Sequence, residues 1–459
     1  MSWELKDIYK ALNKDLGKIK NINFKNISID SRTIKKNDLF IPICGKNFDG
    51  HNFINEVSKK GVKACLIEKN KQQLVQNKNI HKIIVNDTVE SLKKLATYSR
   101  EKKKNLTMIC ITGSTGKTSL KEWLGRVLEK KIKTYVSPGN FNNEIGMPLS
   151  LVNMPAETKI CVLELGMNNY GEIKELTKIS KPTISIITNI GLAHIGNFHK
   201  PEEIANEKSE IFSYLEENSF ALIPRDSFYY NFLLKRAKRK TKNIISFGAD
   251  VTSDSNFKKI NNYSFLFSIL GSKIILKKMN KFLHWEVNVL IILCVLKILK
   301  LKTQDFLKFI GKLKPLQGRG QLLKITLKKK SFTLIDESYN SSPQSLKSAI
   351  FNSKELVKTK KNLILVIGDM LELGVNSKKM HLEILDVIKK VSPFMVITVG
   401  KITKALNENL PRKIKKVHYL SIKHLYERLI EEISDGDIVM IKGSNSINLS
   451  KICDKLKKA

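Results

Sequence analysis

Residues 106–128 restrict the possible folds of this chain more strongly than any other segment. The apolar run "LTMICIT" (106–112) predicts a buried strand, and the loop "GSTGKT" (113–118) follows it. Leu120, Leu124, Val127 and Leu128 then recur at helical spacing. A buried strand that passes through a glycine-bearing loop into an amphipathic helix is typical of a parallel sheet covered on both faces. The segment therefore predicts an α/β fold.

The same rhythm of apolar strands repeats along the chain, separated by helix-like or loop segments. The further predicted strands are 160–165, 184–190, 332–336, 363–368, 395–400 and 437–443. A chain of 459 residues is also too long for one ordinary core. We predict three domains, of which the last two are α/β. The run "SREKKKN" and the stretch 300–320, with Pro315, Gly318 and Gly320, suggest the boundaries. The predicted domains are 1–104, 105–314 and 315–459.

The strong positive charge raises the possibility of nucleic-acid binding. The chain has 81 basic and 43 acidic residues, a formal net charge of +38. A basic surface attracts phosphates, so a nucleic-acid-associated protein with a phosphate-binding loop is one hypothesis. However, only nine of the 81 basic residues are arginine, and the lysines are spread over the whole length. We therefore interpret most of this charge as solvated surface and expect no nucleic-acid partner.

The cysteines and the apolar segments indicate the compartment. The N-terminal sequence "MSWELKDIYKALNK" lacks the apolar core of a secretory signal, and the most apolar run, 289–296, is too short to span a bilayer. That run predicts a buried helix. The six cysteines contain no C-x-x-C pair, which favours core thiols in a reducing cytoplasm. They are Cys44, Cys65, Cys110, Cys161, Cys294 and Cys453.

The loop after the first strand predicts phosphate binding. Glycines let backbone N–H groups curl around phosphate oxygens at the start of a helix. Lys117 is expected to neutralise the β- and γ-phosphates, and the Thr118 hydroxyl to hold Mg²⁺. The common loop would require glycine at position 111, where this chain has Ile111. The predicted nucleotide-binding residues of this loop are Gly113, Ser114, Thr115, Gly116, Lys117, Thr118 and Ser119.

Three further residues have two interpretations each when only the residue pattern is considered. Glu164 closes an apolar strand, so it is either a metal ligand or half of a structural ion pair. His194 lies in a glycine-bearing loop, and a single histidine there is more often packed or exposed than a ligand. Lys208, in "ANEKSEIF", reads as a surface lysine that pairs with Glu207 or Glu210.

A series of motifs in a fixed order goes beyond these patterns. The motifs are "ITGSTGKTS", "SPGNFNNEIGMPLSL", "LELGMNNYGEI", "TNIGLAHIGNF", "EKSEIF", "LQGRGQ", "IDESYNSSPQSL", "VIGDMLELG" and "IKGSNS". In this order they resemble the Mur ligase family over essentially the whole chain. The family uses the short T-G-x-x-G-K-T form of the phosphate loop, which accounts for Ile111.

The resemblance implies an ATP-dependent ligase that needs Mg²⁺ and forms an acyl phosphate. It implies that Lys117, Glu164, His194 and Lys208 are catalytic. It also implies that Thr118, Glu164, His194 and Lys208 are metal ligands, with Lys208 as a carbamate. Further nucleotide contacts are implied at Asn288, Arg319, Asp336 and Asn340. Asn140, Asn142 and Asn143 fall in a loop that nucleotide and substrate share. Tyr339, Asp369 and Glu372 fall in motifs that border the closed site.

The N-terminal stretch "ISIDSRTIKKNDLFIPICGKNFDGHNFI" is similar to the small α/β UDP-sugar-binding domain of the family. The resemblance also implies a central P-loop domain built on a parallel sheet and a Rossmann-like α/β C-terminal domain. The implied substrate-binding residues there are Ser31, Arg32, Asp49, Gly50 and His51. "DESYNSSP" and "GDMLELG" look like the branch that adds D-alanyl-D-alanine to a UDP-N-acetylmuramoyl-tripeptide. The sister ligase that adds the third amino acid, diaminopimelate or lysine, is the alternative. We expect a cytoplasmic monomer.

Overall fold

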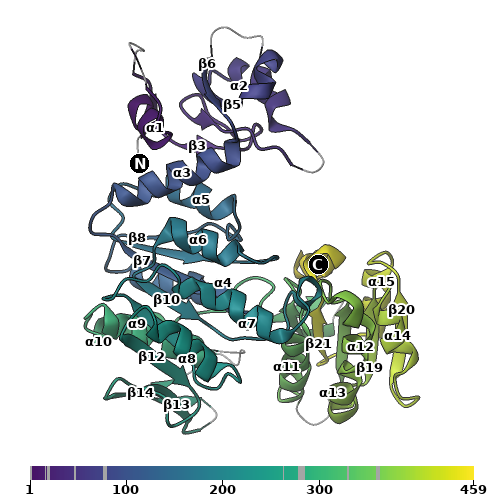
Figure 1. Cartoon of the computed structure of the whole chain (residues 1–459). Helices are drawn as coiled ribbons and strands as arrows, with labels where there is room; N and C mark the ends of the chain where they lie inside the picture. Colours follow the sequence, from purple (N-terminus) through teal and green to yellow (C-terminus); the bar gives the residue numbers. More distant parts are fainter. Residues whose placement is uncertain are drawn as a thin grey trace.

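The computed structural model describes residues 3–15, 17, 21–45, 48–75, 80–261, 263–277, 285–327, 330–357 and 362–458. Three larger sheets follow one another along the chain, each associated with helices (Figure 1). The fold therefore consists of three α/β domains, as the sequence predicts. We call them the first, central and C-terminal domains, and the boundaries at 104/105 and 314/315 remain predictions.

The first domain contains a parallel four-stranded sheet in the order β3-β4-β5-β6. Its strands are β3 (Ile27–Ser28), β4 (Leu39–Phe40), β5 (Ala64–Glu68) and β6 (His81–Val85). Helix α2 (Ile54–Lys59) packs within the domain, and α3 (Thr88–Glu101) leads out of it. A separate two-stranded pair, β1 (Trp3–Glu4) and β2 (Asn23–Phe24), flanks α1 (Leu5–Ala11).

The first and central domains are joined through a short helix, α5 (Gly146–Val152), against which α3 packs. At the C-terminal end of α5 the Trp3 indole donates a hydrogen bond to the Val152 carbonyl over 2.8 Å. The Asn153 side chain accepts a hydrogen bond from the Ile27 N–H and donates one to the Ile27 carbonyl, each at 2.9 Å. At its other end, α5 begins directly after the loop that carries the predicted asparagines 140–143.

The central domain is built on a nine-stranded sheet in the order β15-β14-β13-β12-β11-β10-β7-β9-β8. The parallel strands are β7 (Thr107–Thr112), β8 (Thr134–Val136), β9 (Ile160–Glu164), β10 (Ile184–Ile187), β11 (Phe220–Pro224), β12 (Asn243–Gly248) and β13 (Ser255–Lys259). Strands β14 (Ser264–Ile269) and β15 (Ser272–Lys277) extend the sheet in antiparallel fashion, a feature that the sequence pattern did not predict.

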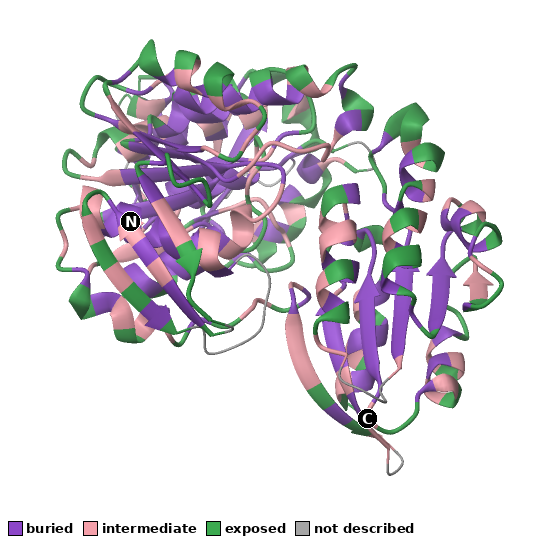
Figure 2. Ribbon diagram, turned by 90° about the horizontal axis from the view of Figure 1, so that it is seen from below, coloured by how far each residue is buried: buried purple, intermediate pink, exposed green. Residues whose placement is uncertain are grey.

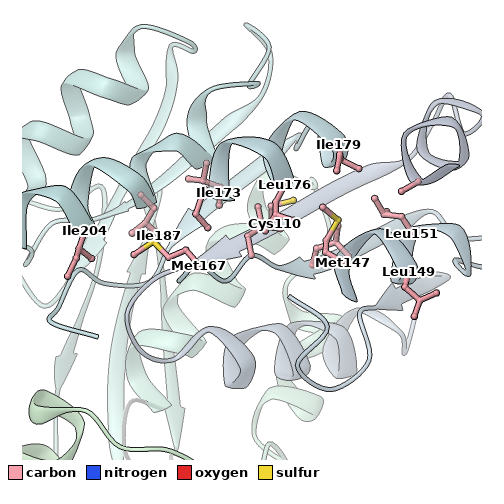
Figure 3. Close-up of a cluster of buried hydrophobic side chains, with 14 of the residues drawn as sticks. Cys110, Met147, Leu149, Leu151, Met167, Ile173, Leu176, Ile179, Ile187 and Ile204 are labelled. Carbon is pink, nitrogen blue, oxygen red and sulfur yellow. The ribbon is translucent and has the colours of Figure 1, made fainter. Parts of the chain in front are cut away.

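Successive side chains of a strand point to opposite faces, and both faces of strand β7 are covered by packed residues. Met108 and Cys110 belong to a hydrophobic cluster formed with α3, α5 and α6 (Glu172–Ser180), part of which Figure 3 shows. Ile109 and Ile111 belong to a second cluster with α4 (Lys117–Leu128) and α9 (Trp285–Ile298). The predicted amphipathic helix after the loop and the predicted buried helix over 289–296 are thus confirmed.

The C-terminal domain has a six-stranded sheet in the order β16-β17-β21-β18-β19-β20, parallel except for the β16–β17 pair. The strands are β16 (Gln321–Leu327), β17 (Lys330–Glu337), β18 (Leu363–Gly368), β19 (Met395–Val399), β20 (Lys415–Tyr419) and β21 (Ile438–Lys442). Figure 2 shows buried strands between more exposed helices, which include α11 (Pro343–Lys354) and α13 (Ile384–Val391). In open parallel sheets, ligands bind beyond the carboxyl ends of the strands, where β17, β18 and β21 lead into loops.

The predicted strands are confirmed with small shifts at their ends; β10, for example, stops at Ile187 instead of residue 190. All six cysteines are free, and five of them are buried. Among the described residues no helix is both long and apolar enough to cross a membrane.

Candidate active site

A cleft of about 530 Å³ lies between the carboxyl ends of the central and C-terminal sheets. Its central-domain wall includes Ser114, Thr115, Gly116, Lys117, Thr118, Ser119, Asn140, Asn142, Glu164, His194 and Asn288. Its opposite wall includes Arg319, Glu337, Tyr339, Asn340, Glu372, Lys442 and Asn445. The cleft therefore brings together most of the residues that the sequence assigns to nucleotide and metal binding.

The phosphate loop has a backbone that requires glycine at two places. Gly113 and Gly116 have φ angles of +147° and +83°, conformations that L side chains rarely adopt. A Cβ atom at Gly113 would lie 1.9 Å from the Thr188 hydroxyl oxygen, which leaves no space for a side chain. The Asn189 side-chain oxygen accepts hydrogen bonds from the N–H groups of Ser114 and Thr115 at 3.0 and 2.9 Å. The loop is thus preorganised.

Lys117 is the first residue of α4 and lies in the cleft wall. Its ammonium group donates a hydrogen bond to the carbonyl of Gly113 at 2.8 Å. Burial lowers the pKa of Lys117, the carboxylate of Glu164 opposes this shift, and the Arg319 guanidinium adds to it. A lysine that folds over its own loop beside the N-terminus of a helix is well placed to meet phosphate oxygens.

Glu164 is buried at the end of β9 and accepts two hydrogen bonds inside the cleft. The Thr118 hydroxyl donates to its Oε2 at 2.7 Å, and the Asn142 amide donates to its Oε1 at 2.8 Å. Arg319 Nη2 donates to the Thr118 hydroxyl oxygen at 3.1 Å, so the C-terminal domain contacts this network. Both hydrogen bonds that Glu164 accepts come from neutral donors, which weighs against the structural ion-pair interpretation.

His194 and Glu372 meet across the cleft, with Nδ1 of His194 2.6 Å from Oε2 of Glu372. The contact with His194 holds the pKa of Glu372 below its usual range. The histidine therefore contacts the opposite domain, a pairing that the sequence pattern does not predict.

Lys208 is buried near the end of α7 (Pro201–Ser209) and is not the surface lysine of the simpler interpretation. Glu207 instead accepts hydrogen bonds from the N–H groups of Gly171 and Ile173, both at 2.9 Å, and Glu210 pairs with Arg236. Burial lowers the pKa of the Lys208 ammonium well below its ordinary value. The charge of Lys117 lowers it further, and Glu207 and Glu164 oppose the shift.

The donor chemistry of these residues fits Mg²⁺. The cation prefers oxygen ligands, and the cleft offers the Glu164 carboxylate and the Thr118 hydroxyl in contact with each other. In the parts of the chain that the structure describes, no cluster of three or more His, Cys, Asp and Glu side chains could hold a metal by itself. The roles of Thr118, Glu164, His194 and Lys208 as ligands remain predictions.

The predicted asparagines differ in position. Asn140 and Asn142 line the cleft, and so does Asn288, which is buried on α9. Asn143 lies outside the cleft lining, and its side-chain oxygen accepts a hydrogen bond at 2.8 Å from the N–H of Gly146, the first residue of α5. Its contact is therefore with the start of a helix, and a direct role in binding stays a prediction.

Two consecutive acidic residues of β17, Asp336 and Glu337, have different surroundings. Asp336 is buried outside the cleft lining, where it accepts hydrogen bonds from the Ser338 hydroxyl at 2.6 Å and from Lys457 at 2.7 Å. Glu337 lines the cleft and pairs with Lys442 at 3.2 Å. Sequence reasoning missed Glu337 and Lys442. The alternation of side chains along a strand was the signal that could have found Glu337.

The other predicted nucleotide contacts, Arg319 and Asn340, do line the cleft. The Arg319 guanidinium lies over the Tyr339 ring, 3.9 Å from its centroid. The Asn340 carbonyl accepts a hydrogen bond from Lys442 at 2.9 Å. The contact with the Tyr339 ring and the hydrogen bond to Thr118 hold Arg319 opposite the phosphate loop.

The residues predicted to bind the UDP-sugar lie in the first domain and do not line this cleft. The Arg32 side chain is 84% exposed and forms two hydrogen bonds to the Asp30 carboxylate, which lower the pKa of Asp30 to about 2. The Ser31 carbonyl accepts a hydrogen bond from Lys60 at 2.7 Å. Arg32 is thus oriented but accessible to a ligand.

Asp49, Gly50 and His51 form a tightly fixed turn in the same domain. The Asp49 carboxylate accepts hydrogen bonds from the backbone N–H and ring Nδ1 of His51, at 3.0 and 2.7 Å, and pairs with Lys71. His51 is buried, and its Nε2 accepts a hydrogen bond from the Glu68 N–H. A Cβ at Gly50 would lie 2.7 Å from the nitrogen of Ile43. Direct substrate contacts by these three residues remain predictions.

A phosphate loop at the end of a central parallel strand, faced by a second α/β domain across a polar cleft, defines a nucleotide-dependent enzyme whose active site is shared between domains. Comparison with known families is consistent with this class. Residues 23–100 match the catalytic domain of the Mur ligase family, residues 111–289 the Mur ligase middle domain, and residues 318–445 the Mur ligase glutamate ligase domain.

Individual relatives cover nearly the whole chain. The UDP-N-acetylmuramoyl-tripeptide–D-alanyl-D-alanine ligase of Rickettsia prowazekii is 35% identical over 99% of both chains. The crystal structure of MurF from Acinetobacter baumannii has a TM-score of 0.87 at 25% identity, over 100% of this chain and 99% of that one. The Thermotoga maritima MurF ligase in complex with ADP has a TM-score of 0.80 at 26% identity, over 95% and 97%. The chain belongs to the Mur ligase family.

Proposed function

We propose that this protein is an ATP-dependent ligase that joins D-alanyl-D-alanine to UDP-N-acetylmuramoyl-tripeptide in peptidoglycan synthesis. The observation that carries the proposal is 35% identity over 99% of the chain to a ligase of that name. The cleft supports it independently, because it combines a phosphate loop, a buried carboxylate and cationic side chains from two domains. Because the proposed reaction consumes ATP and UDP-linked precursors, we expect it to take place in the cytoplasm.

The proposed reaction has two steps. The γ-phosphoryl group of ATP passes to the terminal carboxylate of the tripeptide, which gives an acyl phosphate and ADP. The amine of D-alanyl-D-alanine then attacks the carbonyl carbon, and phosphate leaves as the amide bond forms. Because two anions must meet in the first step, the site has to supply positive charge and alignment more than covalent chemistry.

The residues of the cleft can supply that charge. Lys117 would contact the β- and γ-phosphates from one wall and Arg319 from the other, so nucleotide binding and closure of the cleft are coupled. Glu164 and Thr118, with His194 and carbamylated Lys208, would hold Mg²⁺. When bound, the cation neutralises phosphate charge during phosphoryl transfer. Asn288 would lie near the adenine.

One assay separates this function from the alternatives. Release of ADP is measured with UDP-N-acetylmuramoyl-tripeptide plus D-alanyl-D-alanine, with UDP-N-acetylmuramoyl-dipeptide plus diaminopimelate or lysine, and with DNA. We expect turnover only in the first mixture. Turnover in the second would identify the sister ligase. DNA-stimulated hydrolysis, or DNA binding that survives about 0.2 M salt, would favour a nucleic-acid-associated protein, since charge-driven binding weakens steeply with salt.

The proposed UDP-sugar contact makes a separate prediction for Arg32→Ala. Arginine recognises phosphate or carboxylate with two parallel hydrogen bonds, and this guanidinium is exposed and oriented by Asp30. The substitution should raise the Michaelis constant for the UDP-substrate far more than that for ATP. Lys35→Ala, which removes a neighbouring exposed positive charge, is the matched control. The assignment fails if the ATP constant changes instead.

A further inference from the structure

A second lysine of α4, Lys121, is buried behind the loop that carries the predicted asparagines. It lies one turn after Lys117, and its side chain is completely buried. Its ammonium group donates hydrogen bonds to the carbonyls of Ser137 and Gly139 at 2.5 and 2.7 Å, and a Glu122 carboxylate oxygen lies 3.1 Å away. An ammonium group has three hydrogens, so these oxygens can satisfy it completely. A buried cation is costly without such partners, and the three contacts therefore define where Lys121 must lie.

The two carbonyls belong to the loop that follows β8 and leads into the cleft. Residues 138–141 of this loop are exposed, so burial of apolar side chains contributes little to its position. A segment with few buried contacts opens easily unless its hydrogen bonds hold it. The hydrogen bonds from Lys121 come from below the loop, out of the solvent, and are thus a main restraint on its first part.

The last part of the loop is restrained at Asn142, beside the carboxylate in the cleft. The Asn142 carbonyl accepts a hydrogen bond from the N–H of Gly166 at 2.8 Å, and its amide donates to Glu164 at 2.8 Å. The N–H of Asn142 donates to the carbonyl of Asn140 at 2.8 Å. A Cβ atom at Gly166 would lie 2.9 Å from the Asn142 side chain, so the two segments are in close contact. A shift of the backbone at 137–139 must therefore displace Asn140 and Asn142.

We propose that Lys121 is a positioning residue that fixes the loop 137–142, so that Asn140 and Asn142 keep their places in the cleft relative to the phosphate loop. The importance of the two asparagines for the reaction rests on the function proposed above. Lys117 lies in the first turn of α4 and Lys121 in the next, so one helix places both the phosphate-binding cation and the asparagine loop. Removing the Lys121 ammonium should release the asparagine loop and leave the phosphate loop in place.

The first test follows the loop without any ligand. Lys121→Met keeps a long unbranched side chain but removes every donor, and Arg126→Met, at an exposed position on the same helix, is the matched control. Hydrogen–deuterium exchange is compared in the full-length proteins. In Lys121→Met the N–H groups of Asn142 and Gly166 should exchange faster, while strand β7 keeps its protection. Arg126→Met should exchange as wild type does. A role in stability alone would instead accelerate exchange throughout the central domain.

Nucleotide binding and turnover give a second readout that a role in stability alone would not separate. Isothermal titration with ADP should give the same affinity for Lys121→Met as for wild type, because the phosphate loop keeps its position. In the ligation assay kcat should fall about 100-fold, the cost of displacing a positioned group by about 1 Å. The Michaelis constant should rise for the UDP-substrate and stay the same for ATP. Arg126→Met should change none of these quantities.

Lys121→Gln decides the question if the methionine variant does not fold. Its amide is a donor on a shorter side chain, so we expect one of the two hydrogen bonds to remain and kcat to lie between the values of wild type and Lys121→Met. Unchanged exchange of the loop or unchanged kcat in a folded variant overturns the proposal. An ADP affinity that falls as far as kcat would assign Lys121 to the phosphate loop, and failure of both variants to fold would assign it to stability; either result also overturns the proposal.

The two proposals can fail separately. If wild type does not join D-alanyl-D-alanine to the UDP-tripeptide, the proposed function fails, and the exchange experiment still decides whether Lys121 holds the loop. If wild type is active and the loop exchanges at the same rate in folded Lys121→Met, only the positioning role fails.

Discussion

Replacing Lys208 with alanine should abolish ligation while the protein stays folded, and a short carboxylic acid should restore part of the activity. The amine is buried and lies near the positive charge of Lys117, where an unmodified ammonium is unfavourable. Both effects lower the pKa of Lys208, so more of the amine is neutral near physiological pH. The neutral amine can react with CO₂ to give a carbamate, which replaces the positive charge with two anionic oxygens of the kind that Mg²⁺ prefers.

The loss in rate should exceed about 100-fold, since removal of groups that only support a ligand already costs up to that factor. Asn206→Ala, an exposed position on the same helix, is the control for α7. Lys208→Met tests packing without charge and should be as inactive as the alanine variant. Wild type supplied with ¹³C-bicarbonate should show a carbamate carbon signal that Lys208→Ala lacks. Full activity in Lys208→Ala would falsify the carbamate assignment.

The second large effect is expected for Lys117→Ala, which should lower kcat by about 10²- to 10³-fold. Its ammonium group donates a hydrogen bond to the Gly113 carbonyl, and Lys117 is the cationic residue within the phosphate loop itself. The substitution removes charge where negative charge develops during phosphoryl transfer. Melting temperature should change little, because the contacts of Lys117 are polar and the side chain lies in the cleft wall.

The control for Lys117→Ala is Lys130→Ala, which removes a half-exposed lysine just beyond the end of the same helix, α4. Initial rates at saturating ATP and isothermal titration with ADP separate the loss of turnover from the loss of binding. A folded Lys117→Ala protein with near-normal turnover would show that the loop does not serve as the phosphate site.

The sequence predicted those elements in which the pattern of apolar residues matches the pattern of burial. Strand β7 and helix α4 were predictable because their apolar residues repeat at the period of the element and are buried on every face that the pattern indicates. The antiparallel strands β14 and β15 were not, because an edge of a sheet mixes exposed and buried positions. Ile275, for example, is 63% exposed on β15.

For the site, the sequence predicted the residue types of the phosphate loop, since only glycine fits the backbone at Gly113 and Gly116. Contacts between domains could not be predicted from the sequence, because the partner of a side chain across a cleft depends on how two separate sheets are placed relative to each other. The pairing of His194 with Glu372 is the clearest example. At Asp336 the motif indicated the right strand, but the neighbouring Glu337 is the carboxylate in the cleft lining.

Helix α5 connects the nucleotide cleft, at one end, with the first domain, where we predict that the UDP-sugar binds, at the other. Asn143, in the loop beside the nucleotide cleft, hydrogen-bonds its first residue, and Trp3 and Asn153 tie its last turn to the first domain. A displacement of this seven-residue helix by a ligand in one region must therefore act on the other. Such coupling is reciprocal: the factor by which bound UDP-sugar changes the affinity for ATP equals the factor by which bound ATP changes the affinity for the UDP-sugar.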